Sequence, residues 1–252
     1  MGDFSDIFNS IPFFTRWWLA LTFGFSLLGR FSVLDYEKLI LEPEGLIRGF
    51  QIWRPISSLF YYPITPNTGF HFLFNCYFLY NYSIKLETGM YSGRPADYCF
   101  LLLFNWLSCV VIGLATGIKL LMDPMVLSVL YIWCQLNQDQ IVSFWFGTRF
   151  KAMYLPWVLL AFNLIINGGG ILELVGILVG HAYFFLMYKY PQEFGGRQFL
   201  TTPNFLYSWF PNTRTIGGVT NTAPIFRAAV PPPGSNARQR HSWGHGNVLG
   251  GN

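Results

Sequence analysis

Residues 171–190 read ILELVGILVGHAYFFLMYKY, an apolar run about as long as the roughly 20 residues that a helix needs to cross a bilayer. One histidine, His181, lies within this run. An ionisable side chain in a membrane-spanning helix is costly, so it indicates either a functional group or a packing residue that hydrogen-bonds to a neighbouring helix. The run therefore predicts a transmembrane helix whose histidine has to be explained.

The composition of the whole chain indicates a membrane protein. Of its 252 residues, 52% are hydrophobic, 19% are aromatic and only 11% are charged, whereas about a quarter of the residues of a soluble domain are charged. Six apolar runs are expected to span the membrane, at 13–33, 70–82, 98–118, 125–134, 153–166 and 171–190. The fourth is short, and the polar stretch QLNQDQ at 135–140 follows it directly. The expected fold is an all-α membrane domain of six transmembrane helices over 1–190.

The basic residues predict how this domain is oriented. Six spans place both termini on one side, which holds seven basic residues close to the membrane, against five on the other side. The seven are Arg16, Lys85, Arg94, Arg149, Lys151, Lys189 and Arg197, and the five are Arg30, Lys38, Arg48, Arg54 and Lys119. Because cytoplasmic loops carry an excess of lysine and arginine, both termini are predicted to be cytosolic.

The chain changes in character after residue 190. It loses its apolar runs and gains proline, glycine, asparagine, threonine and arginine, so 191–240 is expected to be a flexible linker. The last segment, 241–252, places Trp243 and Leu249 on either side of Gly244-His-Gly246. Two large apolar residues around such a bend are typical of a peptide that docks on a partner, and the alternative is an idle disordered tail.

Some classes of site are not expected. The net charge of +4 comes from basic residues in loops and the tail, without a patch interleaved with aromatic residues, so no nucleic acid partner is predicted. The four cysteines lie within or at the edges of the predicted spans, with no CxxC pair and no nearby histidine cluster. We therefore expect no metal site, no cofactor and no disulfide bond.

Two pairs of residues are candidates for function near the first loop. The mixed polar and apolar segment 34–59 is expected to lie in the membrane interface. Within it, Trp53 and Arg54 put an indole ring beside a guanidinium group, which is typical of an interface anchor. In the second span, His71 and Asn75 are four residues apart and therefore share one face of a helix.

Four stretches together resemble the Derlin family of rhomboid-related proteins of the endoplasmic reticulum, and most closely its Derlin-1 branch. They are QIWRP at 51–55, GRPADY at 93–98, SFWFGTRFK at 143–151 with YLPW at 154–157, and WGHGNVLG at 243–250. The resemblance covers 11–205 and resumes at the terminal motif. It implies a rhomboid-like six-helix fold in the endoplasmic reticulum membrane and a role in extracting misfolded proteins for degradation, during which short helices distort and thin the lipid bilayer.

The resemblance also implies partners and site residues. The terminal segment is similar to the SHP box that binds the hexameric AAA ATPase valosin-containing protein, with Trp243, Gly244, Gly246 and Leu249 as contact residues. Trp53 and Arg54 match the family's first-loop motif, and Gly176 and Gly180 match the GxxxG of the sixth helix. Misfolded clients, a membrane ubiquitin ligase complex and other copies of Derlins are the remaining expected partners.

An active rhomboid-type serine protease is the alternative function. His181 lies where the rhomboid base would be, and His71 with Asn75 resembles the HxxxN that lines the oxyanion site. Ser128 is the serine that the fourth span offers as nucleophile, but Val129 and the leucine before it would crowd the approach of a base. A pseudoprotease is therefore expected, with these four residues as vestiges. A channel or transporter would need an internal repeat, which is not evident.

Overall fold

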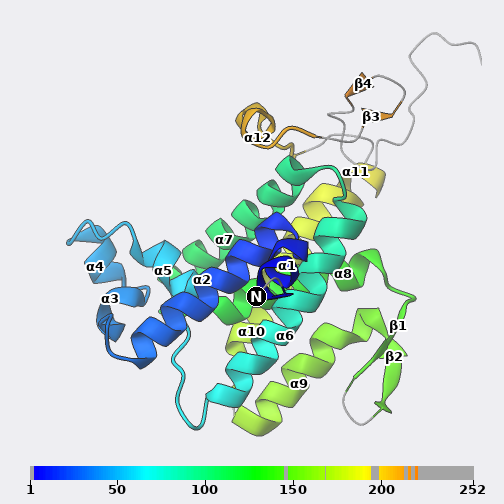
Figure 1. The fold of residues 1–252 in the computed structure, drawn as a ribbon. Helices are drawn as coiled ribbons and strands as arrows, with labels where there is room; N and C mark the ends of the chain where they lie inside the picture. The colour runs from blue at the N-terminus through cyan, green and yellow to red at the C-terminus, as the bar shows by residue number, and fades with distance from the viewer. Residues whose placement is uncertain are drawn as a thin grey trace, which may run out of the picture. The chain divides into compact units, whose positions relative to one another are not determined.

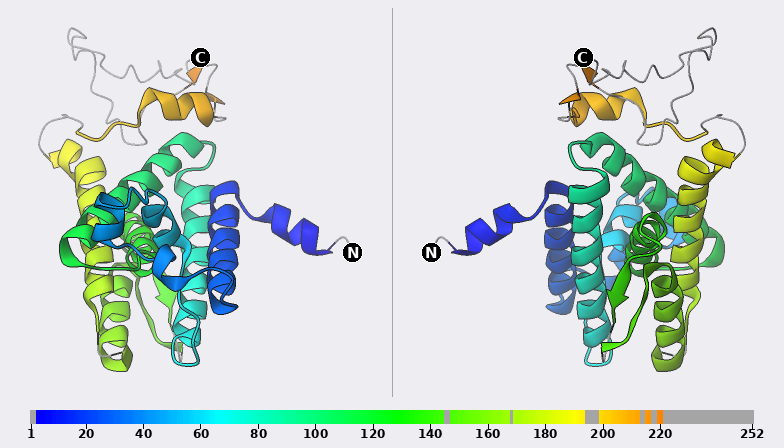
Figure 2. Two further views of the ribbon diagram at one scale, coloured as in Figure 1. Left: turned by 90° about the vertical axis from the view of Figure 1, so that its left-hand side faces the viewer. Right: turned by 90° about the vertical axis from the view of Figure 1, so that its right-hand side faces the viewer.

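Six long helices form the body of the protein. The computed structural model describes residues 3–144, 147–167, 169–193, 199–212, 215–216 and 219–220. These residues belong to the first of two units of chain, Met1–Thr222, and the second unit, Ala223–Asn252, lies outside them. The long helices are α2 (Phe13–Arg30), α6 (Gly69–Lys85), α7 (Pro95–Thr116), α8 (Met122–Leu136), α9 (Leu155–Asn167) and α10 (Ile171–Phe184). They pack side by side (Figures 1 and 2).

Each predicted apolar run overlaps one of these helices. Two helical stretches are long and apolar enough to cross a membrane: Pro95–Thr116, and Ile171–Glu193, which continues α10 through the π-helix η4 (Phe185–Lys189) and α11 (Tyr190–Glu193). Met122–Leu136 and Ala152–Ile165 are apolar but shorter. The described chain is therefore mostly helical with two clear spanning helices, and a crossing by each of the other four stays a prediction.

Helix α8 lies at the centre of the body. All of its residues from 122 to 134 are buried. Two glycines of α10 let that helix approach α8 closely: a Cβ atom added at Gly176 would lie 2.7 Å from the carbonyl oxygen of Pro124, and one at Gly180 would lie 2.8 Å from that of Ser128. Since Cβ atoms do not approach backbone atoms so closely, the contact between α10 and α8 depends on these two glycines.

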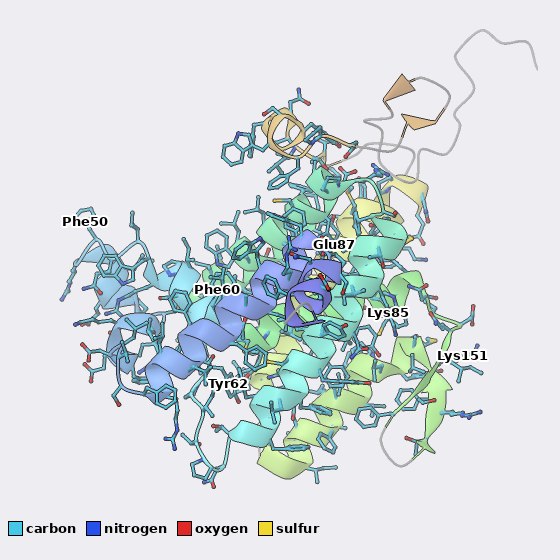
Figure 3. All side chains as sticks on the ribbon, viewed as in Figure 1. Phe50, Phe60, Tyr62, Lys85, Glu87 and Lys151 are labelled. Atoms are coloured by element: carbon cyan, nitrogen blue, oxygen red, sulfur yellow. The ribbon has the colours of Figure 1, made fainter. Side chains whose placement is uncertain are left out.

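A carboxylate from elsewhere in the chain caps the start of α2. Glu87, in the π-helix η1 (Leu86–Met90), accepts hydrogen bonds from the backbone N–H groups of Phe14 at 2.9 Å and Thr15 at 3.0 Å, and from the Thr15 hydroxyl at 2.8 Å. It lies where the end of α6 meets α2 (Figure 3). The first N–H groups of a helix have no partner within the helix, and the helix dipole favours an anion there, so Glu87 joins these two helices.

The all-α expectation needs a small correction between α8 and α9. The strands β1 (Ile141–Ser143) and β2 (Arg149–Lys151) form an antiparallel pair in which Val142 lies opposite Phe150. Gly147 turns the chain with a φ of +74°, a conformation that favours glycine. The short 3-10 helix η3 (Ala152–Tyr154) then leads into α9. A hairpin forms because β-branched and aromatic residues flank this glycine turn.

The remaining elements lie before, between and after the long helices. The helix α1 (Asp3–Ser10) precedes α2, and the first loop contains α3 (Tyr36–Leu39), α4 (Pro43–Ile47) and α5 (Arg54–Phe60). After α11 come α12 (Asn204–Trp209) and the antiparallel pair β3 (Thr215–Ile216) and β4 (Val219–Thr220). The elements α11, α12, β3 and β4 lie within 191–240 or at its edge. This is the stretch that the sequence predicts to be a flexible linker.

The helix α12 is held to the start of α7 by a buried carboxylate. Asp97 Oδ1 accepts hydrogen bonds from the Thr202 hydroxyl at 2.6 Å and the Tyr207 hydroxyl at 2.7 Å. Its other oxygen lies 2.6 Å from a guanidinium nitrogen of Arg94. The ring of Phe210 also packs 5.1 Å from that of Phe14 in α2. The GRPADY motif thus anchors the first part of the segment that follows the body.

Candidate functional site

A polar pocket lies where three helices begin. His71 is in the first turn of α6, Asp123 in the first turn of α8 and Glu173 in the first turn of α10. The pocket has a volume of about 450 Å³ and is also lined by Tyr62, Asn67, Thr68 and Leu172. Tyr62 lies near the beginning of α6, at the end of the body away from α12 (Figures 1 and 3).

Hydrogen bonds connect the polar side chains of the pocket. Asn75 Nδ2 donates to Asp123 Oδ1 at 2.5 Å and to His71 Nδ1 at 3.3 Å. The Tyr62 hydroxyl lies 2.7 Å from the same imidazole nitrogen. In the wall behind the pocket, Asn163 Nδ2 donates to Glu173 Oε1 at 2.6 Å. These bonds join α6 to α8 and α9 to α10, so the pocket has fixed walls.

The hydrogen bonds also fix the form of the imidazole. An amide nitrogen can only donate, so Nδ1 of His71 accepts and its proton is on Nε2. Nε2 lies 4.0 Å from Glu173 Oε1. Burial, and then the nearby Asp123 and Glu173, raise the pKa of Tyr62, so its hydroxyl keeps its proton and can donate to Nδ1.

Two buried acidic side chains line the pocket. Asp123 is 6% exposed and Glu173 is 7% exposed. In the described part of the chain, neither carboxylate forms an ion pair with a lysine or an arginine, and His71 is the basic group closest to Glu173. The beginnings of α8 and α10 carry partial positive charge, which helps to stabilise carboxylates in their first turns. The pocket therefore presents acceptors to whatever enters it.

The residues expected as vestiges of a protease do not form a catalytic pair. The hydroxyl of Ser128 is fully buried and donates to the carbonyl oxygen of Met125 at 2.8 Å. His181 is exposed, and its Nδ1 lies 2.8 Å from the hydroxyl of Tyr131. Among the described residues no hydrogen bond joins Ser128 to His181, and a nucleophilic serine needs such a base. His181 instead links α10 to α8, which is the structural role weighed against catalysis.

The first-loop pair divides into two roles. Trp53 is 50% exposed and adjoins Ile52, which is 75% exposed, so an anchor in the membrane interface fits the tryptophan. Arg54 is only 6% exposed. Its guanidinium donates to the carbonyl oxygens of Glu37 at 2.7 Å and Ile40 at 2.9 Å. Arg54 therefore holds the loop together from within rather than reaching the headgroups.

The sequence did not single out Tyr62, Asp123 and Glu173 of the pocket, nor Asn163 behind it. The signal that could have found Glu173 is a carboxylate inside an apolar run, since such groups are costly in a membrane helix and are usually functional. Asp123 lies just before the run 125–134, where an acidic residue reads as an ordinary helix start. The terminal residues Trp243, Gly244, Gly246 and Leu249 lie outside the described residues. The described residues contain no cluster of histidine, cysteine and acidic side chains that could hold a metal ion.

Comparison with known proteins agrees with the resemblance in the sequence. The profile of the Der1-like family matches residues 11–204. The chain is similar to Derlin-1 of Homo sapiens, with 55% identity over 254 residues that cover 99% of both proteins. It is similar to Derlin-1 of Caenorhabditis elegans, with 48% identity over 99% of this chain and 100% of the relative. Derlin-1 of Drosophila melanogaster is 45% identical over 97% of this chain and 98% of the relative.

Proposed function

Because the chain belongs to the Der1-like family and to its Derlin-1 branch, we propose that it is a non-proteolytic component of endoplasmic-reticulum-associated degradation. It aids the retrotranslocation of misfolded lumenal and membrane proteins to the cytosol. The helical body distorts the bilayer and guides the client, and the tail recruits the AAA ATPase valosin-containing protein, which pulls. A membrane ubiquitin ligase and further Derlin copies complete the assembly.

The observation that carries this proposal is the polar pocket among apolar helices. A polypeptide that enters a membrane brings backbone and side-chain polar groups that lipid cannot satisfy. The carboxylates of Asp123 and Glu173 and the hydroxyl of Tyr62 line a space of about 450 Å³ at one end of the body. Hydrogen-bonding groups in this place lower the cost of moving a polar client chain off the lipid and against the protein.

A short helix supports the distortion of the bilayer. At about 1.5 Å per residue, the 13 residues of α9 span about 20 Å, less than the roughly 30 Å of a hydrocarbon core. This helix has exposed apolar side chains, among them Leu164 and Ile165. Lipid beside a short helix thins to match it, which shortens the path of a client.

The orientation follows from the excess of basic residues beside the termini. In the proposal the protein lies in the endoplasmic reticulum membrane with α12 and the tail in the cytosol. The beginnings of α6 and α10 lie at the opposite end of the body from α12 (Figure 2), so the pocket that they line then faces the lumen, where misfolded lumenal clients arrive. Client entry and ATPase recruitment are thereby separated by the membrane.

The test of the pocket is the degradation of a misfolded lumenal glycoprotein in cells that lack their own Derlins. Changing both His71 and Glu173 to leucine removes polar lining, so the half-life of the client after synthesis is blocked should lengthen several-fold relative to wild type. The matched control is His181→Leu, which likewise removes an imidazole that hydrogen-bonds to a neighbouring helix, but outside the pocket. An unchanged half-life in the pocket variant would remove the observation on which the proposal rests.

The test of the tail is co-purification of the ATPase. Trp243→Ala combined with Leu249→Ala should abolish it while insertion into the membrane continues. His245→Ala, a change within the same segment but outside the four contact residues, is the control and should keep the ATPase bound. If the double variant still retains the ATPase at the wild-type level, recruitment does not use this segment.

The protease alternative is tested with a serine-directed fluorophosphonate probe. We expect no labelling that depends on Ser128, because its buried hydroxyl donates to the Met125 carbonyl and, among the described residues, no histidine hydrogen-bonds to it. The protein with Ser128→Ala is the control for non-specific reaction. Labelling of the wild type that both Ser128→Ala and His181→Ala remove would instead establish a protease.

A further inference from the structure

We propose that the polar pocket is a selective site for a cationic group, the ammonium of a lysine or the guanidinium of an arginine on the client polypeptide. This inference rests on the proposed function, since it names the part of the client that the pocket recognises. It concerns the pocket of Tyr62, His71, Asp123 and Glu173 at the beginnings of α6, α8 and α10.

Two buried acidic side chains of the pocket have no basic partner in the described chain. A buried carboxyl group without a cationic partner either stays protonated or attracts a cation, because a lone buried charge is costly. Here two carboxylates, each more than nine-tenths buried, share one pocket. Among the described residues, no lysine or arginine pairs with either of them, and no three metal-binding groups come together. A cation from outside the chain is the partner that this arrangement lacks.

The second argument is an oxygen of Asp123 that has no donor. Asn75 occupies Oδ1 at 2.5 Å. No hydrogen bond reaches Oδ2 from any part of the chain that the structure describes, although the residue as a whole is only 6% exposed. Asp123 lines the pocket, so this acceptor is available to a ligand there. A charged donor is the ligand that gains most from it.

The rest of the lining leaves space for a side chain. Nδ1 of His71 is already used by its neighbours, and its buried Nε2 lies 4.0 Å from Glu173 Oε1. The volume of about 450 Å³ lies within the range of small-ligand sites, far above the roughly 30 Å³ of one water molecule. A cationic side chain in this space finds carboxyl acceptors from α8 and α10.

The experiment uses the full chain in phosphatidylcholine vesicles with a photo-crosslinking amino acid at Asn67, an exposed residue of the pocket lining. The probes are three polar peptides that differ at one central position, which is lysine, arginine or glutamine. We expect the lysine and arginine peptides to crosslink about tenfold more than the glutamine peptide, the ratio that one hydrogen bond to a charged group supports.

Two sets of variants assign this preference to the pocket. The double variant Asp123→Asn with Glu173→Gln should crosslink the lysine and arginine peptides no more than the glutamine peptide. The matched control, Glu37→Gln with Glu44→Gln, removes the same charge from exposed sites in the first loop and should keep the preference. Leu172→Lys places a cation in the pocket with both carboxylates intact, so it should also suppress the preference, while Leu172→Met should not.

The outcomes are distinct. Equal crosslinking of all three peptides to the wild type, or a preference that survives the loss of both carboxylates, overturns the cation site while leaving client binding intact. No crosslinking of any peptide above a control with the photo-reactive residue at exposed Thr116 contradicts the proposed function itself. If phosphatidylethanolamine in the vesicles abolishes the preference, a lipid ammonium is the occupant and the assignment to the client is overturned.

Discussion

Arg54 holds the first loop together through a single guanidinium group. Besides the carbonyl oxygens of Glu37 and Ile40, it bonds to Gln51 Oε1 at 2.5 Å through Nε. An ammonium group cannot reproduce this fork of donors, so Arg54→Lys is not a conservative change. We expect it to cost the loop about 2 kcal/mol of local stability, because buried carbonyl groups lose their donors.

The measurement is limited digestion with chymotrypsin, which cuts after aromatic residues. Phe50 is 81% exposed and Trp53 is 50% exposed, so both sites lie on the loop that Arg54 holds. Cleavage there should accelerate by about tenfold or more in Arg54→Lys. Arg48→Lys, at an exposed position of the same loop, is the control. Equal rates for the two variants would mean that the guanidinium is not what orders the loop.

At the residue scale, the sequence predicted only the two site residues that lie one turn apart on the same helix. The spacing of His71 and Asn75 predicts a shared face, and the two side chains do contact each other at 3.3 Å. Asp123 and Glu173 come from other helices, 48 residues beyond Asn75 in the first case. Their meeting depends on how the helices pack, which helical periodicity does not contain.

At the element scale, the contact between α10 and α8 gives a sharp prediction. Gly176→Ala would place its Cβ 2.7 Å from the Pro124 carbonyl oxygen and 2.8 Å from Leu127 Cβ, so the helices must move apart. Overpacking of this kind costs about 1–3 kcal/mol. Gly24→Ala in α2 is the control, since nothing lies within 4 Å of the added atom and alanine favours a helix.

Thermal unfolding in detergent measures both variants. Gly176→Ala should lower the midpoint, and Gly24→Ala should leave it unchanged or raise it slightly. If both variants shift it alike, the small residue at 176 has no special part in the packing of α10 on α8.

The anchor of α12 gives a second prediction at this scale. Burial, with Asp97 adding to it, raises the pKa of Tyr207, so its hydroxyl remains a donor to Asp97 throughout the physiological range. Thr202→Val with Tyr207→Phe removes both donors to Asp97 at nearly constant shape. We expect α12 to detach, with amide hydrogen exchange in Asn204–Trp209 faster by about tenfold or more.

Ser208→Ala is the control for the α12 anchor, because its exposed hydroxyl bonds to Phe205 within α12 itself. Exchange in α12 that is as slow in the double variant as in Ser208→Ala would show that ring packing by Phe210, and not the carboxylate, holds the helix. The sequence could not predict this anchor, since the two hydroxyls lie more than 100 residues from Asp97.

At the scale of the whole molecule, the sequence predicted the apolar helices well because hydropathy acts locally. The runs at 98–118 and 171–190 correspond to Pro95–Thr116 and Ile171–Glu193. The sequence did not predict the hairpin of β1 and β2, because the many aromatic residues of 142–157 make its glycine turn hard to recognise. The burial of α8 was also beyond prediction, since a short apolar run reads alike whether lipid or protein surrounds it.

The buried α8 leaves α9 as the short helix that presents apolar side chains outward, and this arrangement predicts how the protein responds to bilayer thickness. Its length of about 20 Å suits a bilayer thinner than the usual hydrocarbon core of about 30 Å. A mismatch between helix length and hydrocarbon thickness costs a fraction of a kcal/mol per ångström, so a difference of several ångströms lowers the stability measurably. In phosphatidylcholine vesicles of increasing acyl length, the thermal midpoint should therefore be highest in the thinner bilayers and fall as they thicken. A midpoint that rises steadily with thickness would mean that tilt of the longer α7 sets the match instead, and the body would not be a membrane-thinning device.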